Sequence, residues 1–111
     1  MKEYRIEFTQ DAKNYIVNLY NWLVNKFDKQ SAVNVKDELE HSIGNLSAMP
    51  GLGRDASELS SLLVGYRYLH LKRNTVFYKV YEDQELVYVI NIYDNRMDVL
   101  NHLLEYLQEK G

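Results

Sequence analysis

Residues 66–93 read YRYLHLKRNTVFYKVYEDQELVYVINIY, a stretch rich in the β-branched and aromatic residues that favour strands. Short polar connectors interrupt it at 72–74 and at 82–85, and connectors of this length suit tight turns between neighbouring strands. The stretch therefore predicts an antiparallel meander, which decides the fold. Its strands are expected at residues 66–71, 75–81 and 86–93.

Ahead of the meander, the spacing of apolar residues changes from every second residue to the spacing of a helix. Residues 4–8 alternate apolar and charged side chains, which is typical of a half-buried strand. Thr9 stands where a helix N-cap is expected, with Asp11 in the first turn. A polar link at 28–31 separates two helical stripes, so we expect an antiparallel helix hairpin. The stripes are Ala12, Tyr15, Ile16, Leu19, Leu23 and Phe27, and then Ala32, Val35, Leu39, Ile43 and Leu46.

Two further segments complete the expected order. Pro50, the only proline, ends the second helix with Gly51 and Gly53 beside it and opens an irregular stretch that reaches about Gly65. After the meander, Asp94 or Asn95 is expected to cap a last helix. Its apolar stripe is Leu100, Leu103, Leu104 and Leu107.

This order, β-α-α-β-β-β-α, predicts the α+β class and a single domain over residues 1–111. We expect the helix hairpin to pack on one face of a small antiparallel sheet, with mixed pairing at the first strand. The opposite face of the sheet would then be open for function.

Composition bounds the setting in which the protein works. The 111 residues carry a formal net charge of −3 and no cysteine, so no disulfide or thiolate metal site is expected. The charged start, residues 1–8, does not fit a signal peptide, and no apolar run reaches membrane-spanning length. We therefore expect a cytoplasmic protein that makes no membrane contact.

Several residues, in this order and spacing, resemble the RelE/ParE superfamily of toxins, also called plasmid-stabilisation proteins. The opening strand running into a helix at 5–12 is similar to the family's start, and Leu46, Pro50, Gly53 and Arg54 are similar to its helix-ending segment. The later signatures are Tyr66-Arg67, the run VFY at 76–78, and the run VYVINIYDNRMD at 87–98. The resemblance covers almost the whole chain.

The resemblance implies a toxin of a bacterial type II toxin–antitoxin system. Family members pair with a small antitoxin whose segment wraps the toxin, so a cognate antitoxin is the expected partner. The expected assembly is a homodimer of the chain or a heterotetramer with the antitoxin. The fold hosts two activities, because ParE-like members poison DNA gyrase whereas RelE-like members cut messenger RNA on the ribosome. Fold alone does not choose between these two targets.

For a nuclease, the candidate catalytic residues are Arg67, His70, Tyr93, Asp94 and Arg96. RNA cleavage without a metal needs a proton acceptor, cations for the scissile phosphate and an acid for the leaving oxygen. Strand alternation places Arg67 and His70 on opposite faces unless the strand bulges. The resemblance adds two departures: Thr75 stands where many nuclease relatives have an arginine, and Asp94 where they often have histidine. The acidic composition also disfavours an approach to ribosomal phosphates.

A second set of residues is expected to contact partners. Trp22 packs in the core or, if exposed, marks a partner surface, and the leucine stripe of the last helix could be covered by the antitoxin or by a second copy of the chain. The remaining histidines, His41 and His102, show no metal-ligand spacing, and most tyrosines are expected to line the sheet. Neither a metal nor a cofactor is expected.

The sequence therefore favours a ParE-like toxin that poisons DNA gyrase and is neutralised by its antitoxin. Two alternatives stay open. One is a RelE-like, ribosome-dependent mRNA endoribonuclease, and the other is a non-toxic binding module that kept the fold.

Overall fold

The computed structural model describes residues 3–110. Within these residues, three helices and five strands follow one another, joined in places by short 3-10 turns. The strands are β1 (Arg5–Phe8), β2 (Arg54–Asp55), β3 (Arg67–His70), β4 (Asn74–Tyr81) and β5 (Leu86–Asp94). The helices are α1 (Gln10–Lys26), α2 (Lys29–Gly44) and α3 (Val99–Lys110).

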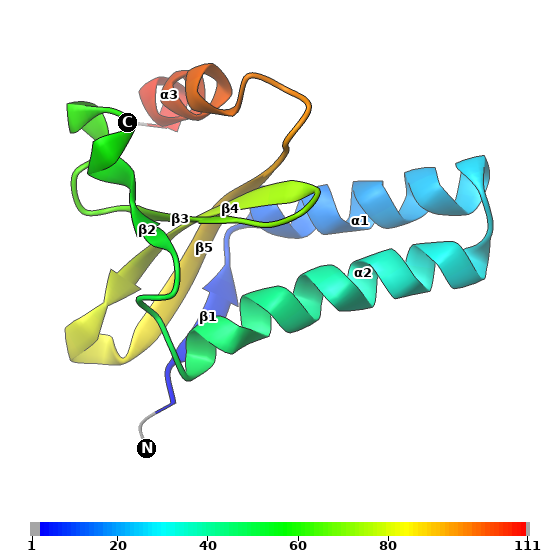
Figure 1. The fold of residues 1–111 in the computed structure, drawn as a ribbon, viewed down its shortest axis with the longest axis horizontal. Helices are drawn as coiled ribbons and strands as arrows, with labels where there is room; N and C mark the ends of the chain where they lie inside the picture. The colour runs from blue at the N-terminus through cyan, green and yellow to red at the C-terminus, as the bar shows by residue number, and fades with distance from the viewer. Residues whose placement is uncertain (1–2, 111) are drawn as a thin grey trace.

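The five strands form one sheet in the order β1-β5-β4-β3-β2 (Figure 1). β1 pairs with β5 in parallel, and every other neighbouring pair is antiparallel. The register shifts once, between Phe77 and Tyr78 of β4, because Phe77 pairs with Asn91 while Tyr78 pairs with Val89. Ile90 is the extra residue of this bulge. The mixed α+β architecture expected from the sequence is confirmed.

The hairpin of α1 and α2 packs on one face of the sheet and extends beyond it (Figure 1). The apolar stripes of both helices supply its side of the core, and every second residue of the central strands supplies the other side. The main members of this core are Ala12, Ile16, Leu39, Ile43, Leu46, Leu69, Val76, Tyr78, Val87, Val89 and Ile92.

The opposite face of the sheet is not open, contrary to the expectation from the sequence. The segment of short 3-10 turns at 56–63 folds onto it together with α3, and both contribute to a second apolar cluster. That cluster contains Ala56, Leu63, Phe77, Tyr93 and Leu103. Leu63 of the irregular segment helps to hold it there, because burying this side chain on the sheet removes apolar surface from water.

Three local details differ from the sequence prediction. The two-residue strand β2 was not expected, since two exposed residues carry no periodicity. The polar link between the helices is shorter, because Asp28 caps α2 by accepting a hydrogen bond from the Ser31 N–H at 2.7 Å. Asp98, rather than Asp94 or Asn95, precedes α3 and accepts from the Asn101 N–H at 3.4 Å.

Thr9 joins β5 to the start of α1. Its hydroxyl accepts from the Ala12 N–H at 3.1 Å and donates to the Ile90 carbonyl at 2.6 Å. Replacing Thr9 by alanine removes both contacts, so we expect the free energy of unfolding to fall by about 1–2 kcal/mol. Urea unfolding of Thr9→Ala and Thr9→Ser, with serine keeping the hydroxyl, checks this. An equal loss in both variants would contradict a role for the hydroxyl.

Candidate functional site

The five residues proposed for nuclease chemistry are divided between the two faces of the sheet. β3 pairs with β4 without a register shift, so strict alternation separates Arg67 from His70. Arg67 and Asp94 lie on the hairpin face, whereas His70 and Tyr93 flank Thr75 on the face covered by α3. The separation expected from the sequence therefore holds, and no bulge in β3 reunites the two side chains.

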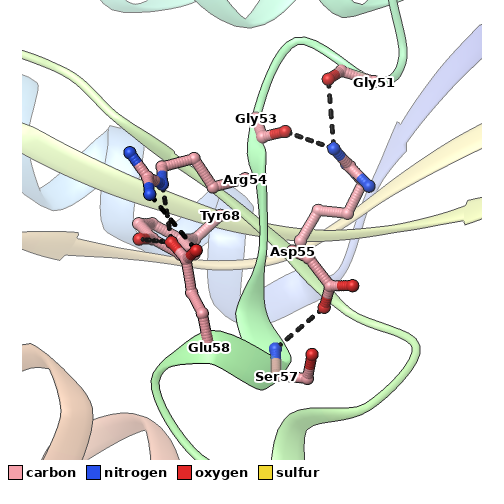
Figure 2. Close-up of polar contacts among 8 residues, drawn as sticks. Gly51, Gly53, Arg54, Asp55, Ser57, Glu58 and Tyr68 are labelled. Carbon is pink, nitrogen blue, oxygen red and sulfur yellow. Dashed lines mark hydrogen bonds and ion pairs between the residues drawn. The ribbon is translucent and has the colours of Figure 1, made fainter.

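Arg67 is engaged by the loop that precedes β2. Its Nη2 donates to the carbonyls of Gly51 at 3.1 Å and Gly53 at 2.5 Å, and both contacts are drawn as dashed lines in Figure 2. The Nε of Arg67 is fully enclosed and has no hydrogen-bond partner among residues 3–110. The guanidinium therefore holds this loop against β3.

Tyr78 also binds the backbone of this loop. The Tyr78 hydroxyl donates to the Pro50 carbonyl at 2.8 Å and accepts from the Gly53 N–H at 2.9 Å. Side chains from β3 and β4 thus satisfy the backbone groups of one short loop. We call Pro50, Gly51, Gly53, Arg67 and Tyr78 the loop clamp.

Arg67 also lies far from the other candidates. It pairs with Tyr78, whereas Asp94 pairs with Asn74, four residues away along β4. That offset spans about 14 Å along the strand, and β3 and β5 are separated by about 10 Å across β4. Arg67 and Arg96, which follows Asp94 by two residues, therefore do not converge on one phosphate.

A polar cluster beside the loop clamp lies on the other side of β2. Arg54 contacts Glu58 through Nε at 2.6 Å, and the Tyr68 hydroxyl donates to the same carboxylate at 2.5 Å (Figure 2). The Arg54 guanidinium, followed by Tyr68, holds the pKa of Glu58 below its usual range. Because the Arg54 side chain is 71% exposed, this ion pair contributes little to stability.

At the end of β5, Asp94 and Arg96 form an ion pair. Arg96 donates through Nε to Oδ1 at 3.0 Å and through Nη2 to Oδ2 at 2.7 Å. The hydrogen bond from Arg96 is the main reason why the pKa of Asp94 is lowered. Asp94 is thus a carboxylate at neutral pH and a poor acid for a leaving oxygen.

Tyr15 of α1 lies next to this pair. Asn74 donates to the Tyr15 hydroxyl at 2.6 Å. Burial, and then the charge of Asp94, raise the pKa of Tyr15 to about 12. Tyr15 therefore stays neutral at physiological pH.

His70 belongs to a network that ties the β3–β4 turn to the end of β5. Its Nδ1 lies 3.3 Å from the Thr75 hydroxyl, which donates to Asn95 Oδ1 at 2.6 Å. Asn95 in turn donates to the Leu71 carbonyl at 2.7 Å. Thr75 is only 6% exposed and its hydroxyl is already bonded, so this position does not present a group to a phosphate.

Tyr93 is also enclosed, being 7% exposed in the cluster under α3. Its hydroxyl accepts from Asn91 at 3.3 Å, and burial raises its pKa to about 12. A tyrosine with a raised pKa is a weak proton acceptor at neutral pH.

The leucine stripe of α3 faces inward rather than outward. Leu103 is 2% exposed, and Leu100, Leu104 and Leu107 pack partly buried against the same cluster. The Tyr106 hydroxyl donates to Asp11 at 2.8 Å and joins α3 to α1. These leucines attach the last helix to the sheet of its own chain.

A groove of about 400 Å³ lies between the hairpin, the β3–β4 turn and the end of β5. Trp22 and Phe27 stand at its hairpin side, 49% and 61% exposed, with their rings 6.2 Å apart at 81°. The lining residues define what we call the turn groove. They are Tyr15, Leu19, Trp22, Leu23, Phe27, Val35, Lys72, Arg73, Asn74, Asp94, Asn95 and Arg96.

The turn groove contains residues that sequence reasoning placed elsewhere. Phe27 was assigned to the core of the first helix, but it is the C-cap residue of α1 and lies outside. The capping residue Asp28, which follows Phe27, was the available signal that Phe27 lies at the end of its helix. A side chain at a helix junction often points away from the apolar stripe. For Trp22 the sequence left two possibilities, a position in the core and an exposed position that marks a partner surface. The residue is half exposed.

Within residues 3–110, no group of three or more histidine, aspartate or glutamate side chains is arranged to hold a metal ion. No helix of that same range is both long and apolar enough to cross a membrane.

Comparison with known families gives a match over residues 6–99. The matching family is described as the ParE toxin of the type II toxin–antitoxin system, parDE. None of the curated proteins compared with the chain matches it.

Solved structures share the fold at low sequence identity. A chain of the chromosomal ParDE system from P. aeruginosa superposes with a TM-score of 0.66 at 20% identity, covering 83% of this chain and 96% of that one. A chain of the RelBE2 toxin–antitoxin complex from Mycobacterium tuberculosis gives 0.60 at 18%, covering 87% and 97%. The isolated E. coli RelE toxin gives 0.59 at 14%, covering 94% and 98%. At these identities the likeness shows the fold.

Proposed function

Because this chain belongs to the family of ParE toxins of type II toxin–antitoxin systems, we propose that it inhibits growth by binding and poisoning DNA gyrase, and that a cognate antitoxin neutralises it. The choice of DNA gyrase over the ribosome as the target rests on one observation. The residues that would cut RNA do not form one site, since they are split between two faces of the sheet.

The individual groups are also poorly suited to RNA cleavage. Arg67 is bound to two carbonyls, and Asp94 is an ion-paired carboxylate. Tyr93 is buried and neutral. Cleavage needs a base, an acid and phosphate-binding cations within reach of one scissile bond. A toxin that acts by binding a protein needs none of these groups to converge.

Ribosome-dependent mRNA cleavage remains the second candidate, on a specific observation. His70, Lys72 and Arg73 are exposed at the β3–β4 turn, where an imidazole and two cations could meet a phosphate. Under this alternative the site would be the turn itself. Arg67 would not take part.

The first experiment induces the chain alone in a bacterial host and follows DNA, RNA and protein synthesis by short radiolabel pulses. We expect DNA synthesis to fall first, with translation initially intact. Co-expression of the protein encoded by the adjacent open reading frame is expected to restore growth. An immediate fall in translation would instead support mRNA cleavage, and unaffected growth at confirmed expression would indicate a non-toxic binding module.

A matched variant separates the two toxic mechanisms. His70→Ala combined with Arg73→Ala removes the exposed imidazole and one of the two exposed cations of the turn without touching the core. Gyrase poisoning should persist in this variant, whereas mRNA cleavage at the turn should be lost. Purified protein, added to a gyrase supercoiling assay, provides the direct readout of the proposed target.

A further inference from the structure

A hollow of about 230 Å³, which we call the clamp hollow, lies beside the loop clamp on the face of the sheet that carries the helix hairpin. Its volume is below the range of pockets for drug-sized ligands, so it suits a small metabolite. Asp55, Arg67 and Glu82 line it together with the apolar side chain of Val80. Within residues 3–110, none of these three charged side chains forms an ion pair. Unpaired charges of both signs around one hollow indicate a ligand that also carries both signs.

The chain satisfies only part of the Arg67 guanidinium. Its Nη2 donates to the carbonyls of Gly51 and Gly53, and its Nε is enclosed without a partner among residues 3–110. Nη1 is not enclosed and has no hydrogen bond with those residues either. Guanidinium N–H groups form their strongest hydrogen bonds with carboxylates. Nη1 is therefore a donor that a ligand carboxylate can reach.

A carboxylate stands next to this donor. Asp55 pairs with Arg67 across β2 and β3, so their Cα atoms lie about 5 Å apart. Hydrogen bonds from Ser57 (Figure 2), and to a smaller extent the charge of Arg67, hold the pKa of Asp55 below its usual value. Asp55 is thus negative at neutral pH. An α-amino acid carries its carboxylate and its ammonium on one carbon, which matches this neighbouring pair of charges.

The third charge lies further away. Arg67 pairs with Tyr78, and Glu82 follows Tyr78 by four residues, a distance of about 13 Å along the strand. Val80 lies between them on the same face. The Glu82 carboxylate accepts one hydrogen bond, from the Tyr4 hydroxyl, and its remaining lone pairs can accept from a cation. A ligand that spans the hollow therefore needs an apolar stem and a second cation at its far end.

We propose that the clamp hollow binds a free basic α-amino acid of the lysine type. Its carboxylate accepts from Arg67 Nη1, and its α-ammonium donates to Asp55. The four-carbon stem packs on Val80, and the side-chain ammonium donates to Glu82. The proposal is independent of whether the chain acts on gyrase or on the ribosome.

Two other ligand classes fit the hollow less well. A simple anion such as phosphate would meet a single guanidinium and two carboxylates, so its net electrostatic interaction would be unfavourable. A divalent metal ion prefers several oxygen ligands close together, whereas no group of three or more possible metal-binding side chains occurs among residues 3–110.

The first test titrates the full chain with L-lysine and follows its backbone amide chemical shifts by NMR. We expect shifts at Gly51 and Gly65, which line the hollow, and a Kd on the order of 1 mM. L-norleucine has the same length but no side-chain ammonium, so it should bind at least about 10-fold more weakly. Nα-acetyl-L-lysine, which lacks the α-ammonium, and L-lysinamide, which lacks the carboxylate, should each lose at least as much.

Matched variants connect each ligand group with its residue. Glu82→Gln still accepts from Tyr4, but it should abolish the preference for lysine over norleucine. Asp55→Asn keeps an acceptor for the Ser57 N–H and should weaken both ligands by the same factor. Glu105→Gln changes the net charge equally at an exposed position of α3, on the other face of the sheet. We expect it to change the Kd by less than about 2-fold.

Several results would overturn the proposal. One is the absence of any shift with lysine at several times the expected Kd, and another is equal binding of lysine and norleucine by the wild-type chain. Equal binding of Nα-acetyl-L-lysine would show that the hollow accepts the end of a peptide rather than a free amino acid. A preference for lysine that persists in Glu82→Gln would exclude the assigned contact. Thermal unfolding checks each variant, and the ligand series on the wild-type chain is decisive even where a variant does not fold.

Discussion

Gly53→Ala is expected to lower the free energy of unfolding by at least about 3 kcal/mol, the largest loss that we predict for a single substitution in this chain. A Cβ added at Gly53 would lie 2.6 Å from the Tyr68 carbonyl oxygen and 2.6 Å from the Tyr78 hydroxyl. The carbonyl belongs to the backbone of β3 and has little freedom to move. The loop would have to shift, and the loop clamp would lose its contacts.

Urea unfolding followed by circular dichroism measures this effect. Gly51→Ala is the matched control, because a Cβ at Gly51 has no atom within 4 Å and the residue lies in the same loop. Its free energy of unfolding should stay within about 0.5 kcal/mol of wild type. Equal destabilisation by both substitutions would show that the loop responds to any added side chain, and the close approach at Gly53 would lose its significance.

Arg67→Met is expected to lower the free energy of unfolding by about 2–3 kcal/mol. Methionine keeps much of the side-chain volume but donates no hydrogen bond, so the Gly51 and Gly53 carbonyls lose their charged donor. Arg54→Met provides the comparison on the adjacent strand. Because the Arg54 ion pair is exposed, its loss should cost less than about 1 kcal/mol.

The same pair of variants tests the role of Arg67 in toxicity. If Arg67 acts only through the loop clamp, growth inhibition by Arg67→Met should follow the fraction of folded protein at each temperature. A variant that is fully folded yet non-toxic would contradict a purely structural role and would give Arg67 a direct part in toxicity.

Much of the local structure was predictable from the sequence. The period-two pattern and polar connectors of 66–93 located β3, β4 and β5 to within a residue or two at most ends. Thr9 was expected to cap α1, and its hydroxyl does so. These features depend on neighbours in the chain, since caps, turns and alternation are all short-range effects.

The candidate site was only partly predictable. The sequence placed Arg67 and His70 on opposite faces, but it did not show that Arg67 binds a loop 14–16 residues away. It left one face of the sheet open, whereas Ala56, Leu63 and α3 cover that face. Phe27 was counted as core and is exposed.

The sequence by itself determined the order of elements, the family and the residue types that could carry chemistry. The tertiary structure alone decided which of those residues meet. Gly53 and Tyr78 are distant in the chain but hydrogen-bonded, and Trp22 and Arg73 are distant but line the same groove. No local pattern records either arrangement. Packing against the sheet determines such pairs. Each strand side chain points to one face of the sheet, and its neighbours are the residues that other elements bury on that face.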